Sequence, residues 1–412
     1  MTRRARARLL LLWGAFLVVH VVTAALGWVY PSQPMGDVVL VYEPWASAAL
    51  SGGAVVGVTD TWVYPQLALV PMLAAGLLST PLVGVLGAST AYLLAWAALM
   101  TVLDTVAFAT LLGRSPAAPR RAAAWFWTGA LLLLGPVGLY RIDAVTVPVV
   151  VLAAAWLVSR PALAAALLAV GAWIKIWPGA VLLAAVVAGR ARLRMLSAAL
   201  MVTAGVIATL LLLGAREEVF GFLAEQTGRG LQIEAVAATP FLWMAARGDA
   251  RIEYSFDILT FQVAAPGADV VAALLTPLMA VVVVGLTVLG LSRARRGASM
   301  ARLLPPLALA LVTALIVTNK VGSPQFQTWL IAPVVLWIVF DRRRAGLPAA
   351  MVLGLCLLTW LVYPIGYDAL LQAWPLAVVV LSLRNALLIV LLVVAVRAIL
   401  RAPASRPTPI QE

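Results

Sequence analysis

Asp37 is the residue whose type and place best suit acid–base chemistry. It precedes a segment that ends at Gly52-Gly53 and whose apolar residues share one helical face: Tyr42, Trp45, Ala46, Ala49 and Leu50. This spacing predicts a short helix on a membrane surface, closed by glycine. A carboxylate held at such a boundary is partly desolvated, which raises its pKa toward that of a general base. The alternative is a solvated loop carboxylate or a charge at a helix N-terminus.

Lys175 is the first cation that suits anion binding. It lies in Trp173-Ile174-Lys175-Ile176-Trp177-Pro178, at the apex of a predicted hairpin of two apolar arms. Arms of about 14 residues, roughly 21 Å, barely cross the hydrocarbon layer. A lysine near the bilayer centre costs about 2.5–3.5 kcal/mol, so it needs an anion or a wet cavity. A lipid phosphate would supply the anion, and a structural ion pair is the alternative.

Further charged residues lie at the predicted membrane boundary. Arg141-Ile142-Asp143 can form an ion pair, or can be an ordinary pair that reaches for the interface. Three more cations occur in polar segments: Arg229 in 228–236, Lys320 in 318–327, and Arg384 where the last crossing begins. Residues 233–244 also present one apolar helical face, which predicts a second surface helix or a re-entrant one.

The inventory excludes several kinds of chemistry. The single histidine, His20, lies in the first apolar run, so a histidine triad or a histidine metal site is excluded. The single cysteine, Cys356, excludes a disulfide framework and a thiolate metal cluster. Phosphate loops, dinucleotide fingerprints and Asp-x-Asp metal pairs are absent from the sequence. We therefore predict no cofactor and no metal ligands, and leave a dependence on a divalent ion open.

The balance of acids and cations favours group transfer from a phosphate. A glycosidase needs two carboxylates, one of them an acid for a poor leaving group. A sugar on a lipid phosphate leaves with an anion, so its transfer needs one base and several cations. The predicted base is Asp37, and the predicted phosphate-binding cations are Lys175, Arg229, Lys320 and Arg384.

The elements that position these residues are membrane helices. Of 412 residues, 64% are hydrophobic and 11% charged, which is too apolar a chain for water. Apolar runs long enough to cross a layer of roughly 30 Å recur, without the alternation of a membrane β-barrel. We predict an all-α polytopic membrane protein of about 12 transmembrane helices, within a range of about 10 to 13, with interfacial helices in its outer loops. Residues 1–401 form one domain, followed by a cytoplasmic tail, 402–412.

Arginine clusters between the apolar runs set the predicted topology. The net charge is +13. The arginine clusters are typical of cytoplasmic loops, and they do not indicate a surface that binds nucleic acid. The predicted crossings are 9–29, one within 65–112, then 122–140, 143–159, 161–176, 177–189, 195–214, 270–291, 303–318, 328–340, 347–363 and 384–400. Residues 65–79 are predicted to form an interfacial helix.

This topology places both termini in the cytoplasm and the polar chemistry outside. Among 16 acidic residues the exceptions are Asp104, Asp341 and Glu412, so the other 13 face outward. The long segments Tyr30–Tyr64 and Ala215–Asp269 also lie outside. Abundant arginine and alanine indicate a GC-rich genome, which favours a bacterial plasma membrane. The predicted active site is therefore on the outer face.

The chain resembles the membrane glycosyltransferases that use polyprenyl-phosphate sugars, in particular glycosyltransferase family 87, an actinobacterial alpha-mannosyltransferase family with the C-type fold. The matching segments run in order along the chain: Asp37 with Tyr42, Tyr64-Pro65, Arg141-Ile142-Asp143, Lys175-Ile176-Trp177-Pro178, Arg229 to Glu234, Asn319-Lys320-Val321 and Ser323-Pro324-Gln325. The chain departs from many relatives in having Tyr140-Arg141 where they have Gly-Gln.

The resemblance implies inverting transfer of a hexose, most simply mannose, from polyprenyl phosphate to a lipid or glycan acceptor of the cell envelope. It gives Asp37 the role of base, and we assign substrate binding to Tyr42, Arg141, Asp143, Gln232 and Gln325. A lipid-linked sugar flippase or transporter is the alternative from another class, although internal repeats and paired broken helices are not visible. A relative that uses another sugar and a noncatalytic scaffold are the remaining alternatives.

Overall fold

The computed structural model describes residues 3–114, 116–255 and 260–403. Within these residues, eight helical stretches are long and apolar enough to cross a membrane: Arg6–Val29, Gln66–Leu86, Ala88–Leu112, Arg192–Leu212, Ala268–Arg295, Met300–Val317, Pro324–Ile365 and Pro375–Leu400. Shorter apolar helices accompany them, so the chain is a polytopic all-α membrane protein, as predicted.

The helices follow one another as the apolar runs do. In the first half they are α1 (Arg3–Val29), α2 (Glu43–Leu50), α3 (Leu69–Ser79), α4 (Val83–Leu86), α5 (Ala88–Leu112), α6 (Ala118–Leu134), α7 (Ile142–Trp156), α8 (Pro161–Ile174), α9 (Trp177–Ala188) and α10 (Arg192–Leu212). In the second half they are α11 (Gly221–Thr227), α12 (Thr239–Ala246), α13 (Ala268–Arg295), α14 (Met300–Val317), α15 (Ile331–Trp360), α16 (Tyr367–Leu371) and α17 (Pro375–Leu400).

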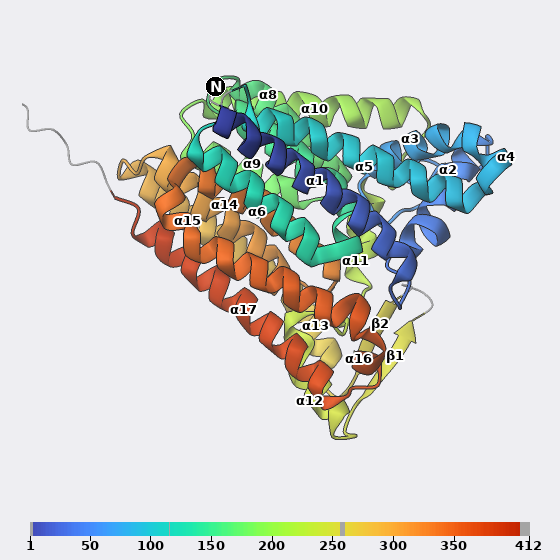
Figure 1. Cartoon of the computed structure of the whole chain (residues 1–412). Helices are drawn as coiled ribbons and strands as arrows, with labels where there is room; N and C mark the ends of the chain where they lie inside the picture. Colours follow the sequence, from blue (N-terminus) through green and yellow to red (C-terminus); the bar gives the residue numbers. More distant parts are fainter. Residues whose placement is uncertain (1–2, 115, 256–259, 404–412) are drawn as a thin grey trace, which may run out of the picture.

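The small elements gather at one end of the molecule. Figure 1 shows α2, α3, α4, α12 and α16 at the end away from the start of α1, together with a β-hairpin. We call this the distal end. The start of α1 and the end of α17 both lie on the opposite side of the molecule, which we call the proximal end (Figure 1). The predicted tail lies outside the described residues from 404 onward, including Glu412.

The predicted crossings at 328–340 and 347–363 belong to one element, α15, which bends at Asp341. Asp341 has non-helical backbone angles and pairs with Arg302 at 2.7 Å. Three arginines follow it, Arg342 to Arg344. Burying such a run of charges in lipid is costly. The bend therefore marks the turn between two crossings.

Two parts of the prediction need correction. Helix α17 starts at Pro375, not at 384, because proline suits the first turn of a helix. Arg384 is consequently inside this helix. The second long loop also contains an antiparallel hairpin of β1 (Arg251–Ser255) and β2 (Thr260–Ala264), which was not predicted.

Buried apolar clusters fix the distal segments. The first loop packs its helical face, with Val38, Tyr42 and Ala46, against α3 and α5, which confirms the predicted helix that ends at glycine. The helix predicted over 65–79 is present as α3, but it belongs to the stretch Gln66–Leu86 that is long enough to cross a membrane, so its interfacial position stays a prediction. A further cluster joins the segment with Leu231 and Ile233 to α12, the hairpin and α17. Burial of each large apolar side chain that is removed from water stabilises the fold by about 1.5–3 kcal/mol.

An ionisable pair joins α1 to α5 inside the helical bundle. His20 of α1 and Asp104 of α5 are both buried, and His20 Nε2 lies 3.0 Å from Asp104 Oδ2. The second ring nitrogen of His20 contacts the Phe16 carbonyl oxygen at 2.8 Å. The pair gives the carboxyl of Asp104 a polar partner in an apolar setting.

Candidate functional site

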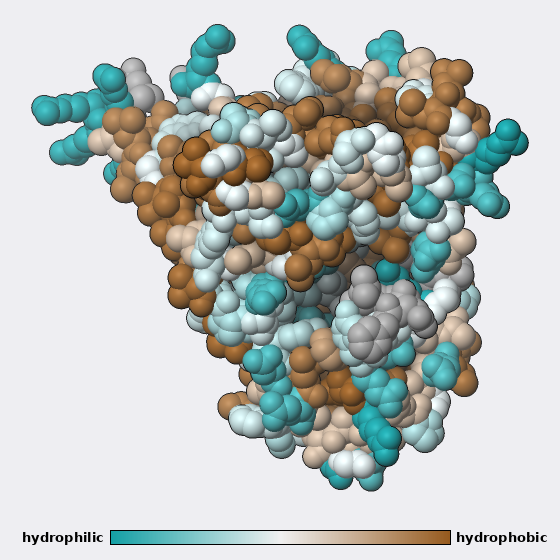
Figure 2. Space-filling view, turned by 90° about the vertical axis from the view of Figure 1, so that its right-hand side faces the viewer, coloured by the Kyte–Doolittle hydropathy of each residue, from teal (hydrophilic) through white to brown (hydrophobic). Residues whose placement is uncertain are grey.

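The distal end carries the polar residues that the sequence singles out. Figure 2 views this end and shows a surface hollowed near its centre, with hydrophilic side chains beside the hollow and apolar areas around it. The contributing segments are far apart in the sequence and meet through the packing described above. Their charged side chains include three groups, each with an ion pair, and a pair of cations, Arg229 and Lys320.

The first group joins Asp37 to Arg141. The Asp37 carboxylate contacts Arg141 Nη1, and its side chain is 36% exposed while that of Arg141 is 7% exposed. Arg141 Nη2 donates to the Tyr363 hydroxyl at 3.0 Å, and this hydroxyl donates to the Ser32 carbonyl at 3.1 Å. Tyr363 therefore ties Arg141 to the loop that carries Asp37. The predicted base is reachable from water, and its cationic partner is not.

The second group surrounds Lys175 at the tip of the α8–α9 hairpin. Lys175 Nζ lies 3.3 Å from Asp143 Oδ2, and Trp329 Nε1 donates to Asp143 Oδ1 at 2.7 Å. The ammonium also lies 4.5 Å from the ring centroid of Tyr64, as in a cation–π contact. Asp143 is fully buried, whereas Lys175 is 15% exposed. The predicted need of Lys175 for an anionic partner is thus met by Asp143 in this structure.

Tyr64 connects these two groups. Burial raises the pKa of its hydroxyl, and the nearby carboxylates Asp37 and Asp143 raise that pKa further, while Arg141 lowers it. Tyr42, its hydrogen-bond partner, accepts the Ile142 backbone N–H at 3.2 Å. Tyr42 thereby holds the start of α7, which carries Asp143, against the first loop.

The third group is a buried pair, Glu234 with Arg384. Arg384 Nη1 donates to Glu234 Oε2 at 2.5 Å and Nη2 donates to the Glu234 carbonyl at 2.6 Å. Both side chains are at most 3% exposed, and Asn385 accepts from the same guanidinium. Burial raises the pKa of Glu234, and Arg384 opposes the rise. The predicted role of Arg384 in binding phosphate conflicts with this burial, because the guanidinium already has its anion.

Gly322 brings the Lys320 turn against the Glu234 segment. A Cβ on this glycine would lie 1.9 Å from the Ala235 backbone nitrogen, so no other residue permits this approach. The Gln232 backbone N–H donates to the Lys320 carbonyl at 3.0 Å, which fixes the two segments together. Gln232 itself is buried, and Gln325 is half-buried in the turn that follows. Their predicted contacts with substrate stay predictions.

Arg229 and Lys320 come together on these two segments. Burial lowers the pKa of Lys320, and the positive charge of Arg229 lowers it further. Burial also lowers the pKa of Arg229, against the opposing effects of Tyr64 and Glu225. Two like charges held close together repel each other, so this arrangement favours binding of an anion. Tyr64 is near both Arg229 and Lys175, so this aromatic side chain links the Arg229 segment to the tip of the α8–α9 hairpin.

Comparison with known proteins adds no relative to this picture, since no family model, curated protein or solved structure matches the chain. Across the described residues, no group of three or more histidine, cysteine, aspartate and glutamate side chains is placed to hold a metal ion.

Sequence reasoning missed three residues of the site. Tyr363 and Trp329 were not singled out, and Tyr64 entered only as part of a resemblance. The available signal was a polar aromatic residue next to proline or at the end of an apolar run, as in Val362-Tyr363-Pro364 and Tyr64-Pro65. Such residues supply a donor where a helix leaves the membrane.

Proposed function

We propose that this protein is a membrane glycosyltransferase that moves a hexose, with mannose as the first candidate, from polyprenyl phosphate to a lipid or glycan acceptor, with inversion. The observation that carries the proposal is the meeting, around Tyr64, of the accessible carboxylate of Asp37 with cations from separate segments: Arg141, Lys175 and Arg229. The resemblance to glycosyltransferase family 87 agrees with that inventory.

The donor phosphate belongs beside Arg229 and Lys320. An anion between these two cations relieves the repulsion that depresses the pKa of Lys320. Each hydrogen bond to a charged group contributes about 1.5–3 kcal/mol. Lys175 is near enough to Tyr64 to join them, although Asp143 now holds it. Arg384 does not bind phosphate in this scheme and instead holds Glu234, and so the Arg229 segment, in place.

Asp37 takes the proton from the acceptor. Its carboxylate accepts the hydroxyl proton while the hydroxyl oxygen forms a bond to the anomeric carbon of the sugar. The bond from that carbon to the phosphate oxygen breaks, and its electrons leave with the phosphate. Arg141 contacts this carboxylate in the structure. A donor phosphate that attracts Arg141 leaves the carboxylate available to the acceptor hydroxyl when the substrate is present.

The proposed location is a bacterial plasma membrane, with the distal end outside and both termini in the cytoplasm. Arginine clusters support this orientation, because Arg3 and Arg4 begin α1 and Arg397 ends α17 at the proximal end. The lipid bilayer, a polyprenyl-phosphate sugar and an envelope acceptor are then the partners. The acceptor approaches Asp37 from the outer side.

The test is transfer of radiolabelled mannose from polyprenyl-phosphate-mannose by membranes that contain the protein. Asp37→Asn should lower the rate by about 10²- to 10⁴-fold at equal expression, as expected for loss of a general base. Asp60→Asn is the matched control, because Asp60 is an exposed acid of the same loop. Translocation of the donor without transfer by the wild type would favour the flippase and contradict the proposal.

A further inference from the structure

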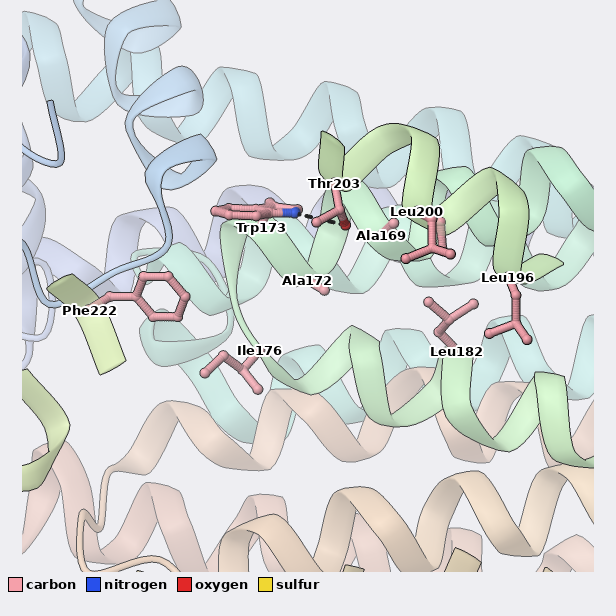
Figure 3. Close-up of a pocket in the computed structure, with 10 residues that line it drawn as sticks. Ala169, Ala172, Trp173, Ile176, Leu182, Leu196, Leu200, Thr203 and Phe222 are labelled. Atoms are coloured by element: carbon pink, nitrogen blue, oxygen red, sulfur yellow. Dashed lines mark hydrogen bonds between the residues drawn. The ribbon is translucent and has the colours of Figure 1, made fainter. Parts of the chain in front are cut away.

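A groove runs along the α8–α9 hairpin on the side covered by α10. Its volume is about 220 Å³, and apolar side chains from these three helices line it together with Phe222 of α11. Figure 3 shows Trp173 and Ile176 near one end of the groove, Thr203 along it, and Leu196 near the other end. The Thr203 hydroxyl accepts a hydrogen bond from Trp173 Nε1 at 3.3 Å, so the polar atoms of the wall satisfy each other.

The groove opens sideways toward lipid. Helix α10 is long and apolar enough to span a membrane, and it packs mainly against α8 and little against α9. Ile176, Leu196 and Leu200 line the groove and are exposed. An occupant therefore enters from the hydrocarbon layer, where the available molecules are lipid chains and not peptides or soluble metabolites.

One end of the groove is formed by residues that are close to two of the cations along the chain. Ile176 directly follows Lys175 in the hairpin turn, Trp173 precedes it by two positions, and Phe222 lies on the helix that leads to Arg229. A chain that lies in the groove thus has its head near groups that bind phosphate. This charge complementarity selects a lipid with an anionic head, and the proposed donor is such a lipid.

We propose that the groove between α8, α9 and α10 binds the isoprene units nearest the phosphate of the polyprenyl-phosphate donor. The inference rests on the proposed function and adds to it the place of the donor's tail. Ligand pockets commonly measure about 300–1,000 Å³, so this smaller groove holds only the first part of the chain and leaves the rest in the bilayer. Ala169, Ala172 and Ala199 leave gaps between larger side chains, and these gaps accept the methyl branches of an isoprenoid.

The test is equilibrium binding of radiolabelled polyprenyl phosphate to the full chain in nanodiscs, without turnover. Ala199→Phe fills the groove and should weaken binding by about tenfold or more. Met201→Phe is the matched control, because Met201 lies on the same helix, is 69% exposed and does not line the groove. Ala199→Leu is a smaller filling variant with the same expected direction, which guards against misfolding of the larger one.

The outcomes separate this inference from the proposed function. If Arg229→Ala weakens binding while Ala199→Phe and Ala199→Leu bind as the wild type does, the groove is not the tail site and the proposed function stands. If phosphatidic acid with two acyl chains competes as well as polyprenyl phosphate, the isoprenoid assignment is overturned. If the wild type does not bind polyprenyl phosphate at all, the proposed function fails as well.

Discussion

Arg141 and Lys320 show how single side chains set the electrostatics of the distal end. Arg141 is buried. It forms an ion pair with Asp37 and donates a hydrogen bond to the Tyr363 hydroxyl. Lys320 shares its surroundings with the like charge of Arg229. The first arrangement gives a buried cation an anionic partner, and the second brings two positive charges together, which favours binding of an anion.

At this scale, binding of the donor should depend on the charge of Lys320. Its pKa is lowered by burial and by Arg229, so the ammonium loses its proton below the value of about 10.4 of an ordinary lysine. Affinity for polyprenyl phosphate should therefore fall as pH rises toward that value. Lys320→Arg stays charged and should move the fall to higher pH. Binding curves of the two proteins between pH 7 and 11 that coincide would contradict this account.

Glu234 and Arg384 hold an element in place. Their pair joins the segment after Arg229 to α17, and Asn385 Nδ2 adds a hydrogen bond to the Thr239 hydroxyl at 2.8 Å. Gly322 then lets the Lys320 turn lie on the same segment. The two segments that carry Arg229 and Lys320 are thus positioned by one buried ion pair.

Removing one partner of this pair should cost more than removing both. Glu234→Gln or Arg384→Met leaves a buried charge unpaired, at a cost of about 3–5 kcal/mol. The double variant leaves no such charge and should recover most of the loss. Thermal unfolding of the four proteins in detergent measures the coupling. Two results would argue that the pair does not hold these segments. One is that the losses in unfolding free energy of the two single variants add up in the double variant, and the other is that each single variant loses less than about 1 kcal/mol.

The sequence predicted the elements better than their pairings. Apolar runs and arginine clusters located the crossings, because lipid demands about 20 apolar residues for each span. They also located Asp37, Arg141 and Lys175 at one end of the molecule. The partner of Arg141 could not be predicted, because Tyr363 is 222 positions away along the chain. The start of α17 was missed because a buried arginine inside a helix is tolerated only through Glu234, a partner that periodicity does not reveal.

At the scale of the whole molecule, the polar residues of the candidate site and the ends of the first and last helices lie on opposite sides. The start of α1 and the end of α17 lie at the proximal end, and the hollow with its polar residues lies at the distal end. An enzyme whose donor and acceptor are both lipids or envelope glycans needs this polarity, because its substrates approach from one side of the membrane.

Cysteine labelling of intact cells should reveal which end of the molecule faces outside. Cys356 is buried, so Cys356→Ser provides a background without a reactive thiol. In it, Asp60→Cys at the distal end should react with a membrane-impermeant maleimide, whereas Arg401→Cys at the proximal end should react only after lysis. The reverse pattern would place the site in the cytoplasm.

We propose that Asp37 acts as the base while Arg229 and Lys320 hold the donor phosphate. Single-turnover transfer from polyprenyl-phosphate-mannose, measured across donor concentrations in the presence of acceptor, tests both roles at once. Asp37→Asn should lower the rate at saturating donor by about 10²- to 10⁴-fold and leave donor affinity within a few-fold. Arg229→Ala should weaken donor affinity by about 10- to 100-fold. An Asp37→Asn protein that transfers at the wild-type rate would contradict the account.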